Sequence, residues 1–169
     1  MVASRLAFIS GIKKKPVTEQ YPFKPISVPE GFRGKPVIDP GKCIGCGACV
    51  NACPPGALSI YDEGDYRVVK LFLGRCIFCG RCQDVCPMGA VRLTDMFELA
   101  SLSRDDLVQE VRLLLEKCSL CGKAFATHRE VRHVEEKLDP EQRWLAHLCP
   151  RCRALVSAKM IGYARGCNR

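Results

Sequence analysis

The sequence lacks the features that identify most enzymes and membrane-spanning proteins. None of its 169 residues lie in a run approaching the roughly 20 apolar residues that a membrane-spanning helix requires. There is no phosphate-binding loop, dinucleotide fingerprint or Ser/His/Asp arrangement, and Asp39, Asp84 and Asp95 do not form a paired acid and base. The sequence therefore predicts a chain with no substrate-converting site of its own that does not itself cross a membrane.

A convincing secretory signal is also missing, because the apolar part of residues 1–15 is short and basic residues follow it. Apolar residues recur at helical spacing in this amphipathic N-terminal segment, and Lys13–Lys15 give it a cationic end. Such a segment can lie on a bilayer surface. It can equally be a frayed or partner-packed arm, since three turns are marginal as an isolated helix. The residues alone leave both interpretations open.

Aromatic residues make up only 7% of the chain, so the hydrophobic core is expected to be modest. Thirteen cysteines inflate the apolar content of 47%, and most of them are expected to bind metal rather than to pack. Metal binding then supplies much of the folding free energy. Low-potential clusters and unpaired thiolates require a reducing compartment, so we expect a cytoplasmic location.

The feature that the sequence does have is the pattern Cys-x-x-Cys-x-x-Cys-x-x-x-Cys-Pro, which occurs twice, 33 residues apart. Three closely spaced thiolates converge on one iron–sulfur cube, whereas the fourth cysteine ligates the cube of the other copy. We therefore expect two [4Fe–4S] clusters. The first cluster is assigned to Cys43, Cys46, Cys49 and Cys86, and the second to Cys76, Cys79, Cys82 and Cys53. A disulfide framework would not need two matched copies, and zinc sites use paired rather than tripled Cys-x-x-Cys units.

A second set of cysteines follows at Cys118, Cys121, Cys149 and Cys152. Two Cys-x-x-Cys pairs are typical of a tetrahedral four-sulfur site, which holds zinc or a single iron. Ligand chemistry favours zinc, which would act as a structural staple, whereas iron would add a redox centre. Cys167 remains unassigned and is expected to be a free thiol. The three histidines are interpreted as ordinary polar residues, although His147 lies close to Cys149.

The formal charge of +8 suggests nucleic-acid binding, but bound metals remove most of it. Two oxidised cubes and a tetracysteine zinc site each carry about −2, which leaves about +2 on the loaded protein. We therefore expect no nucleic-acid partner.

Four segments follow from the composition along the chain. The N-terminal segment, residues 1–15, precedes a proline-rich docking arm at residues 16–40, where helix is excluded and an extended chain is expected. A dicluster ferredoxin domain spans residues 41–95 and a helical metal-binding lobe spans residues 96–169. The predicted fold class is α+β: a two-[4Fe–4S] ferredoxin-like domain with an extended arm and a helical, tetracysteine C-terminal lobe.

Within the ferredoxin domain the sequence predicts three short strands, at residues 57–61, 66–73 and 91–93, with a turn at 62–65 that makes an extended hairpin suited to docking. In the lobe, Leu107, Val111, Leu114 and Leu115 give a helical stripe, and Ser103 with Asp106 a cap. Further helices are expected after Thr127, from Pro140 through Leu148, and over residues 154–163.

Three stretches resemble a known family: RGKPVIDPGKCIGCGACVNACPPGALSI, LFLGRCIFCGRCQDVCPMGAVRLT and YPFKPISVPEGF. They are similar to the iron–sulfur subunit of formate hydrogenlyase and of energy-converting, membrane-bound [NiFe] hydrogenases, and to the dicluster subunit of respiratory complex I. The match covers roughly residues 8–100. The two C-terminal cysteine pairs resemble the extra lobe of the formate hydrogenlyase type, which the complex I subunit lacks.

The resemblance implies a non-catalytic electron-transfer subunit, peripheral on the inner face of the cytoplasmic membrane. Its expected partners are a hydrogenase small subunit and an electron-input subunit, fed by formate dehydrogenase, carbon monoxide dehydrogenase or ferredoxin. It favours a membrane-surface or docking role for residues 1–15. Two alternatives rank behind it: a redox-sensing assembly or regulatory protein that uses the zinc lobe to bind a partner or nucleic acid, and a free ferredoxin with an appendage.

Overall fold

The computed structural model describes residues 18 and 20–166, with side chains in the last helix as far as Lys159. The N-terminal segment at residues 1–15 and the unassigned Cys167 lie outside these residues. Backbone contacts divide the chain into residues 1–32 and residues 33–169. The two units are described separately.

The described part of the first unit has no helix and no strand, as its prolines predict. Its chain turns at residues 21–23 and again at residues 30–31, and the residues between these turns form no regular secondary structure. Two of its large apolar side chains are exposed to different degrees, since Phe23 is 92% exposed and Ile26 is 41% exposed.

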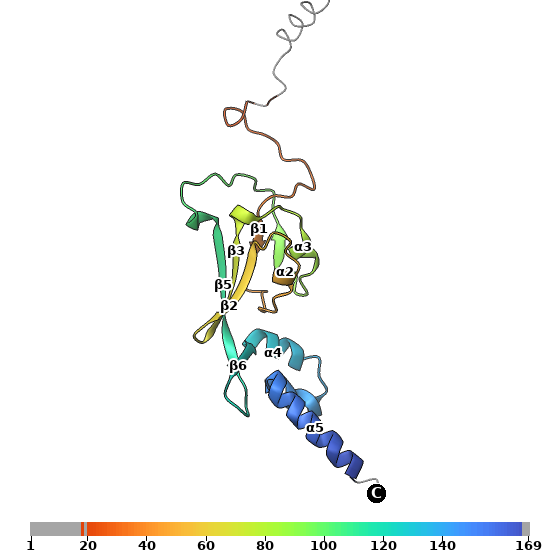
Figure 1. The fold of residues 1–169 in the computed structure, drawn as a ribbon. Coiled ribbons are helices and arrows are strands. Elements are labelled where there is room, and N and C mark those ends of the chain that lie inside the picture. Colours follow the sequence, from red (N-terminus) through yellow and green to blue (C-terminus); the bar gives the residue numbers. More distant parts are fainter. Residues whose placement is uncertain (1–17, 19, 167–169) are drawn as a thin grey trace, which may run out of the picture. The chain divides into compact units, whose positions relative to one another are not determined.

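Two antiparallel sheets form the framework of the second unit (Figure 1). The smaller sheet pairs β1 (Pro36–Ile38) with β4 (Val91–Leu93). The larger sheet has the strand order β2-β3-β5-β6. Its strands are β2 (Leu58–Glu63), β3 (Tyr66–Phe72), β5 (Val108–Lys117) and β6 (Ala124–Thr127).

The predicted strands of the ferredoxin domain are confirmed as β2, β3 and β4, and the predicted turn joins β2 to β3. The β2–β3 hairpin does not extend freely from the domain, because β5 pairs with the whole length of β3. The pairing runs from Tyr66 opposite Leu114 to Phe72 opposite Val108. One edge of the hairpin is therefore covered by residues that come much later in the chain.

The helical stripe predicted around Leu107–Leu115 is wrong. These residues form β5, after a single 3-10 turn at Asp105–Leu107. Val111, Leu113 and Leu115 are buried, while Leu114 is 48% exposed, so the pattern that matters has a period of two. These residues form a strand rather than a helix because β3 and β6 lie on either side of β5 and form hydrogen bonds with its backbone N–H and C=O groups.

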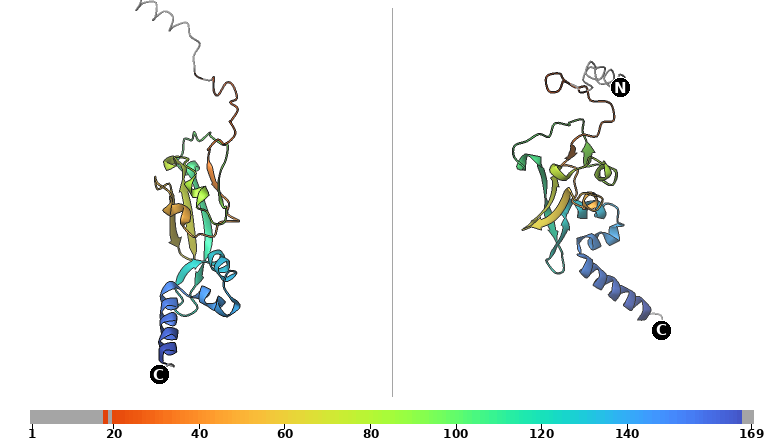
Figure 2. Two further views of the ribbon diagram at one scale, coloured as in Figure 1. Left: turned by 90° about the vertical axis from the view of Figure 1, so that its right-hand side faces the viewer. Right: turned by 45° about the horizontal axis from the view of Figure 1, so that its top comes forward.

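The other expected helices form with some differences. α4 (His128–Glu135) begins as predicted, with the Thr127 hydroxyl accepting the Glu130 N–H. Pro140–His147 is a 3-10 helix that begins at the proline, and α5 spans Pro150–Gly166. α5 runs away from the rest of the unit in both views of Figure 2. The C-terminal part is thus a mixture of strand and helix rather than a purely helical lobe.

Two hydrophobic cores are present among the described residues. The main core lies between the cysteine motifs and the larger sheet, and includes Val69, Leu71, Val111 and Leu113. A small core in the C-terminal part consists of Cys118, Leu148 and Cys149 with partly buried neighbours. No described helix has both the length and the apolar character needed to span a bilayer.

Candidate cluster-binding and metal-binding sites

The two cysteine motifs have the same local structure, as their sequences predict. In each motif a glycine in the left-handed region precedes a four-residue helix: Gly47 (φ 75°) before α2 (Ala48–Asn51) and Gly80 (φ 82°) before α3 (Arg81–Asp84). This conformation is costly for residues that carry a Cβ atom. Glycine at these positions therefore lets the backbone fold tightly around a bound group.

Each motif lines its own cavity with three cysteines, and the fourth cysteine comes from the other motif. One cavity is lined by Cys43, Cys46, Cys49 and Cys86. The other is lined by Cys53, Cys76, Cys79 and Cys82. The empty spaces, which include their openings to solvent, are similar, at about 380 and 370 Å³. The donor sets fit one [4Fe–4S] cube in each cavity.

Backbone N–H groups point at several of these sulfurs. The Ala57 N–H donates to Cys53 Sγ at 3.3 Å, and the Ala90 N–H donates to Cys86 Sγ at 3.1 Å. These two bonds occupy equivalent positions in the repeat. The Phe78 N–H also donates to Cys76 Sγ at 3.4 Å. Such bonds stabilise negative charge on sulfur and so tune the potential of a bound cluster.

The cysteine pKa values reflect the crowding of these thiols. Burial is the largest cause of the raised pKa of Cys43, Cys76 and Cys82, and it raises the pKa of Cys49 to about 12, with further contributions from neighbouring cysteines. The Gly45 N–H and the Arg129 guanidinium act in the opposite direction on Cys43. Four thiolates in one cavity are thus unfavourable unless a cationic metal group compensates their charge.

The four C-terminal cysteines come together in one group. Their Sγ atoms all lie within 4.8 Å of one another, and Cys121 Sγ lies 3.7 Å from Cys149 Sγ. A tetrahedral site with metal–sulfur bonds of about 2.3 Å places its sulfurs about 3.8 Å apart. The group therefore fits a single tetrahedral ion.

The environment of these sulfurs is uneven. The Cys149 N–H donates to Cys118 Sγ at 3.3 Å and is the main cause that lowers the pKa of Cys118 to about 6. Hydrogen bonds from the Cys152 thiol to Cys149 and Cys121 raise the pKa of Cys152 to about 12. The thiolate form of Cys118 is thus favoured, while Cys152 holds a proton that a metal would displace.

His147 is not among the residues that surround this group. Its Nδ1 lies 3.3 Å from Glu116 Oε1 and its Nε2 lies 3.8 Å from Glu135 Oε2. Glu116 also pairs with His128. His128 and His147 thus belong to a polar network with Glu116 of β5 and Glu135 of α4.

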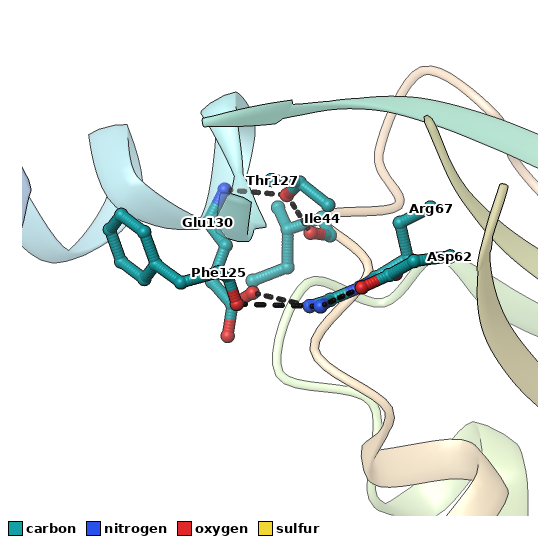
Figure 3. A network of polar contacts seen from close by, with 6 residues as sticks. All are labelled: Ile44, Asp62, Arg67, Phe125, Thr127 and Glu130. Atoms are coloured by element: carbon teal, nitrogen blue, oxygen red, sulfur yellow. Dashed lines mark hydrogen bonds and ion pairs between the residues drawn. The ribbon is translucent and has the colours of Figure 1, made fainter. Parts of the chain in front are cut away.

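The residues after β6 hold the loop of the first motif. The Thr127 side chain is fully buried, and its hydroxyl donates to the Ile44 carbonyl at 2.5 Å (Figure 3). Gly45 (φ 75°) lies so close that an added Cβ would be 2.8 Å from both Leu113 Cδ1 and Thr127 Cγ2. Arg129 donates through Nη1 to the carbonyls of Pro40, Gly41 and Cys43.

A second polar contact joins β3 to the same region (Figure 3). Arg67 donates through Nε to Asp62 at 2.8 Å and through Nη2 to the Phe125 carbonyl at 3.4 Å. Its Nη1 lies 3.6 Å from Glu130 Oε2. Arg67 therefore connects the β2–β3 hairpin with β6 and α4.

Sequence reasoning did not identify Thr127, Arg129 or Arg67 as neighbours of the first motif. The cap formed by Thr127 and Glu130 could be recognised from the sequence, but its hydroxyl has a second partner more than eighty positions away, at Ile44. No local pattern indicates such a contact.

Comparison with known proteins agrees with this geometry. The 4Fe–4S dicluster domain family matches residues 42–90 and 75–127, which together span about half of the chain. Formate hydrogenlyase subunit 6 of Escherichia coli strain K12 is 42% identical over 153 residues, covering 84% of each chain.

More distant similarities cover shorter parts. The NADH-quinone oxidoreductase subunit I of Pseudomonas entomophila strain L48 is 40% identical over 121 residues, which is 65% of this chain and 66% of that protein. A chain in the structure of the membrane-bound sulfane sulfur reductase, an archaeal respiratory membrane complex, is 32% identical, with a TM-score of 0.45 over 60% of this chain and 56% of that chain.

Proposed function

We propose that this chain, which belongs to the 4Fe–4S dicluster domain family, is an electron-transfer subunit that relays electrons to or from a membrane-associated [NiFe] hydrogenase. Its similarity to formate hydrogenlyase subunit 6 supports the proposal. The redox partner on the other side is an input module of the formate dehydrogenase, carbon monoxide dehydrogenase or ferredoxin type. The chain has no catalytic role of its own in this proposal.

The composition of the two cavities is the observation that carries the proposal. Each cavity contains three cysteines of one motif and the fourth cysteine of the other. When bound, the two clusters supply reversible one-electron chemistry. We assign Cys43, Cys46, Cys49 and Cys86 to the first cluster and Cys76, Cys79, Cys82 and Cys53 to the second. The crossed fourth ligands tie the two loops together and so keep the two sites at a fixed separation.

The tetracysteine group is proposed to hold one structural zinc ion. Its cysteines Cys118, Cys121, Cys149 and Cys152 satisfy the preference of zinc for four thiolates, and the core around them is small. A bound ion would join the end of β5 to the start of α5. It would thereby stabilise a part of the chain that has few apolar contacts of its own.

We further propose that the subunit is peripheral, on the inner face of the cytoplasmic membrane, within a multisubunit complex. The proline-rich arm, with Phe23 and Ile26 exposed, is proposed to lie along a partner subunit. The N-terminal segment at residues 1–15 is proposed to contact membrane subunits or the membrane surface.

The test is the content of iron, acid-labile sulfide and zinc in the full chain, purified without oxygen. Two cubes and one zinc ion predict about eight irons, eight sulfides and one zinc per chain. Substitution of Cys121→Ser should remove zinc and leave iron and sulfide unchanged. About nine irons and no zinc would replace the zinc by a mononuclear iron. Fewer than about four sulfides, with several zinc ions, would contradict electron transfer.

A further inference from the structure

The loops of the two motifs differ in what surrounds them. Ile44, after the first cysteine of the first motif, is 8% exposed, whereas its counterpart Ile77 in the second motif is 60% exposed. The cover over the first loop comes from β5, β6 and the start of α4. These elements lie outside the repeat.

Burial of the first loop has an electrostatic cost for a cluster. A reduced cluster carries one more negative charge than an oxidised cluster, and removing water from its surroundings disfavours that charge. On the side of Ile44, burial alone would therefore make the first cluster harder to reduce. The cover over this loop, however, brings a cation with it.

That cation is Arg129, the second residue of α4. Its Nη1 lies 3.1 Å from the Gly41 carbonyl and 3.2 Å from the Cys43 carbonyl, and it also contacts the Pro40 carbonyl. Three backbone acceptors on the segment that leads into the first motif thus fix the guanidinium beside Cys43. Arginine remains charged at any physiological pH.

The guanidinium contacts the backbone of a cluster ligand directly, since its Nη1 lies 3.2 Å from the carbonyl of Cys43. The second motif receives no such contact, because none of the hydrogen bonds of the described residues joins a side chain of residues 108–159 to it.

We infer that Arg129 is a positioning residue that raises the reduction potential of the first cluster selectively and so offsets the burial of its loop. This inference rests on the proposed function, since it requires two bound clusters. The Arg129 side chain is exposed on its outer side, so water screens part of its field. The effect on the potential is therefore expected to be modest but confined to one cluster.

The experiment is a redox titration of the cluster-loaded full chain, followed by electron paramagnetic resonance, with Arg129→Gln beside the natural chain. The signal of the first cluster is identified by its altered line shape in Cys46→Ser, which changes an exposed ligand of that motif. The midpoint potential of the first cluster should fall in Arg129→Gln, while that of the second stays unchanged. Arg129→Lys, which keeps the charge, should restore most of the shift.

The matched control is Arg132→Gln, an exposed arginine on the same helix, which should move neither potential. An equal fall of both potentials, or no fall of the first, in Arg129→Gln would overturn the inference and leave the proposed function intact. A natural chain that binds no clusters would overturn both.

If Arg129→Gln fails to retain the first cluster, a citrulline at this position decides the question. Citrulline has no charge, and it keeps one terminal NH2 group that can donate to the same carbonyls in place of Nη1. The natural junction between Leu120 and Cys121 allows ligation of a synthetic peptide of residues 121–169 that carries citrulline at position 129. A lowered potential of the first cluster in the refolded, reconstituted chain supports the inference. An unchanged potential refutes it.

Discussion

The two copies of the cysteine motif share a backbone but not an environment. Gly45 of the first copy and Phe78 of the second occupy equivalent positions, and both have a positive φ, at 75° and 54°. Gly45 is packed against Leu113 and Thr127, where no Cβ would fit. In the second copy the same position accommodates an aromatic side chain. The motif itself therefore requires only a positive φ at this position. A glycine is needed in the first copy because residues 108–129 pack against it and leave no space for a side chain.

The comparison also shows what the C-terminal part contributes. It gives the first loop hydrogen bonds from Thr127 and Arg129 and apolar contact from Leu113. The second loop receives no hydrogen bond from residues 108–159 among the contacts of the described residues. The C-terminal part thus does more than carry the tetracysteine group, because it also completes the surroundings of the first loop.

The largest effect is expected from Gly45→Ala. The added Cβ would meet two side chains at 2.8 Å and would stand at a φ that L-residues avoid. Backbone strain and overpacking together should cost about 2–5 kcal/mol of unfolding free energy. The measurement is urea denaturation of the loaded chain, followed by the visible absorbance of its clusters.

The control for this substitution is Gly89→Ala, at a φ of 57° with open space around it. Only the backbone term applies there, so the cost should be about 1–2 kcal/mol. If Gly45→Ala and Gly89→Ala lowered the unfolding free energy equally, the close packing of Leu113 and Thr127 against Gly45 would contribute nothing to the effect.

A comparison of Ile44→Ala with Ile77→Ala tests the difference in burial directly. Truncation of the buried Ile44 should cost about 2–4 kcal/mol, whereas truncation of the exposed Ile77 should cost less than about 0.5 kcal/mol. The same urea denaturation measures both variants. Similar losses at the two positions would show that the second loop is also covered in the isolated chain.

The smallest of the three effects is expected from Thr127→Val, which keeps the shape of the side chain and removes its hydroxyl. The Ile44 carbonyl and the Glu130 N–H both lose a partner, at a cost of about 1–3 kcal/mol. Thr127→Ser keeps both hydrogen bonds and should lose about 1 kcal/mol, for one methyl group. Amide hydrogen exchange at residues 44–46 should accelerate in the valine variant and not in the serine variant.

The sequence was sufficient for those parts of the candidate sites whose residues follow a spacing rule. The spacing of the cysteines predicts the sets that line the two cavities, including the exchange of Cys53 and Cys86, because the geometry of the cube limits which sulfurs can meet. The Thr127 cap could be predicted for the same reason, since its partner lies three residues away.

Segments whose structure depends on distant partners could not be predicted in this way. Val108–Lys117 contains apolar residues at helical and at alternating spacing, and only pairing with β3 and β6 selects the strand. The hydrogen bonds from Thr127 and Arg129 to the first loop also depend on residues that are distant in the sequence. In both cases the deciding neighbour is brought close by the fold.

The late position of β5 in the chain has a consequence for synthesis on the ribosome. Both motifs are translated before Val108–Lys117, so a nascent chain that ends after the second motif has β2 and β3 but no strand to cover the edge of β3. Its unpaired backbone groups can then pair with those of another nascent chain. The first loop likewise acquires its neighbours Leu113, Thr127 and Arg129 only after residues 108–129 have left the ribosome.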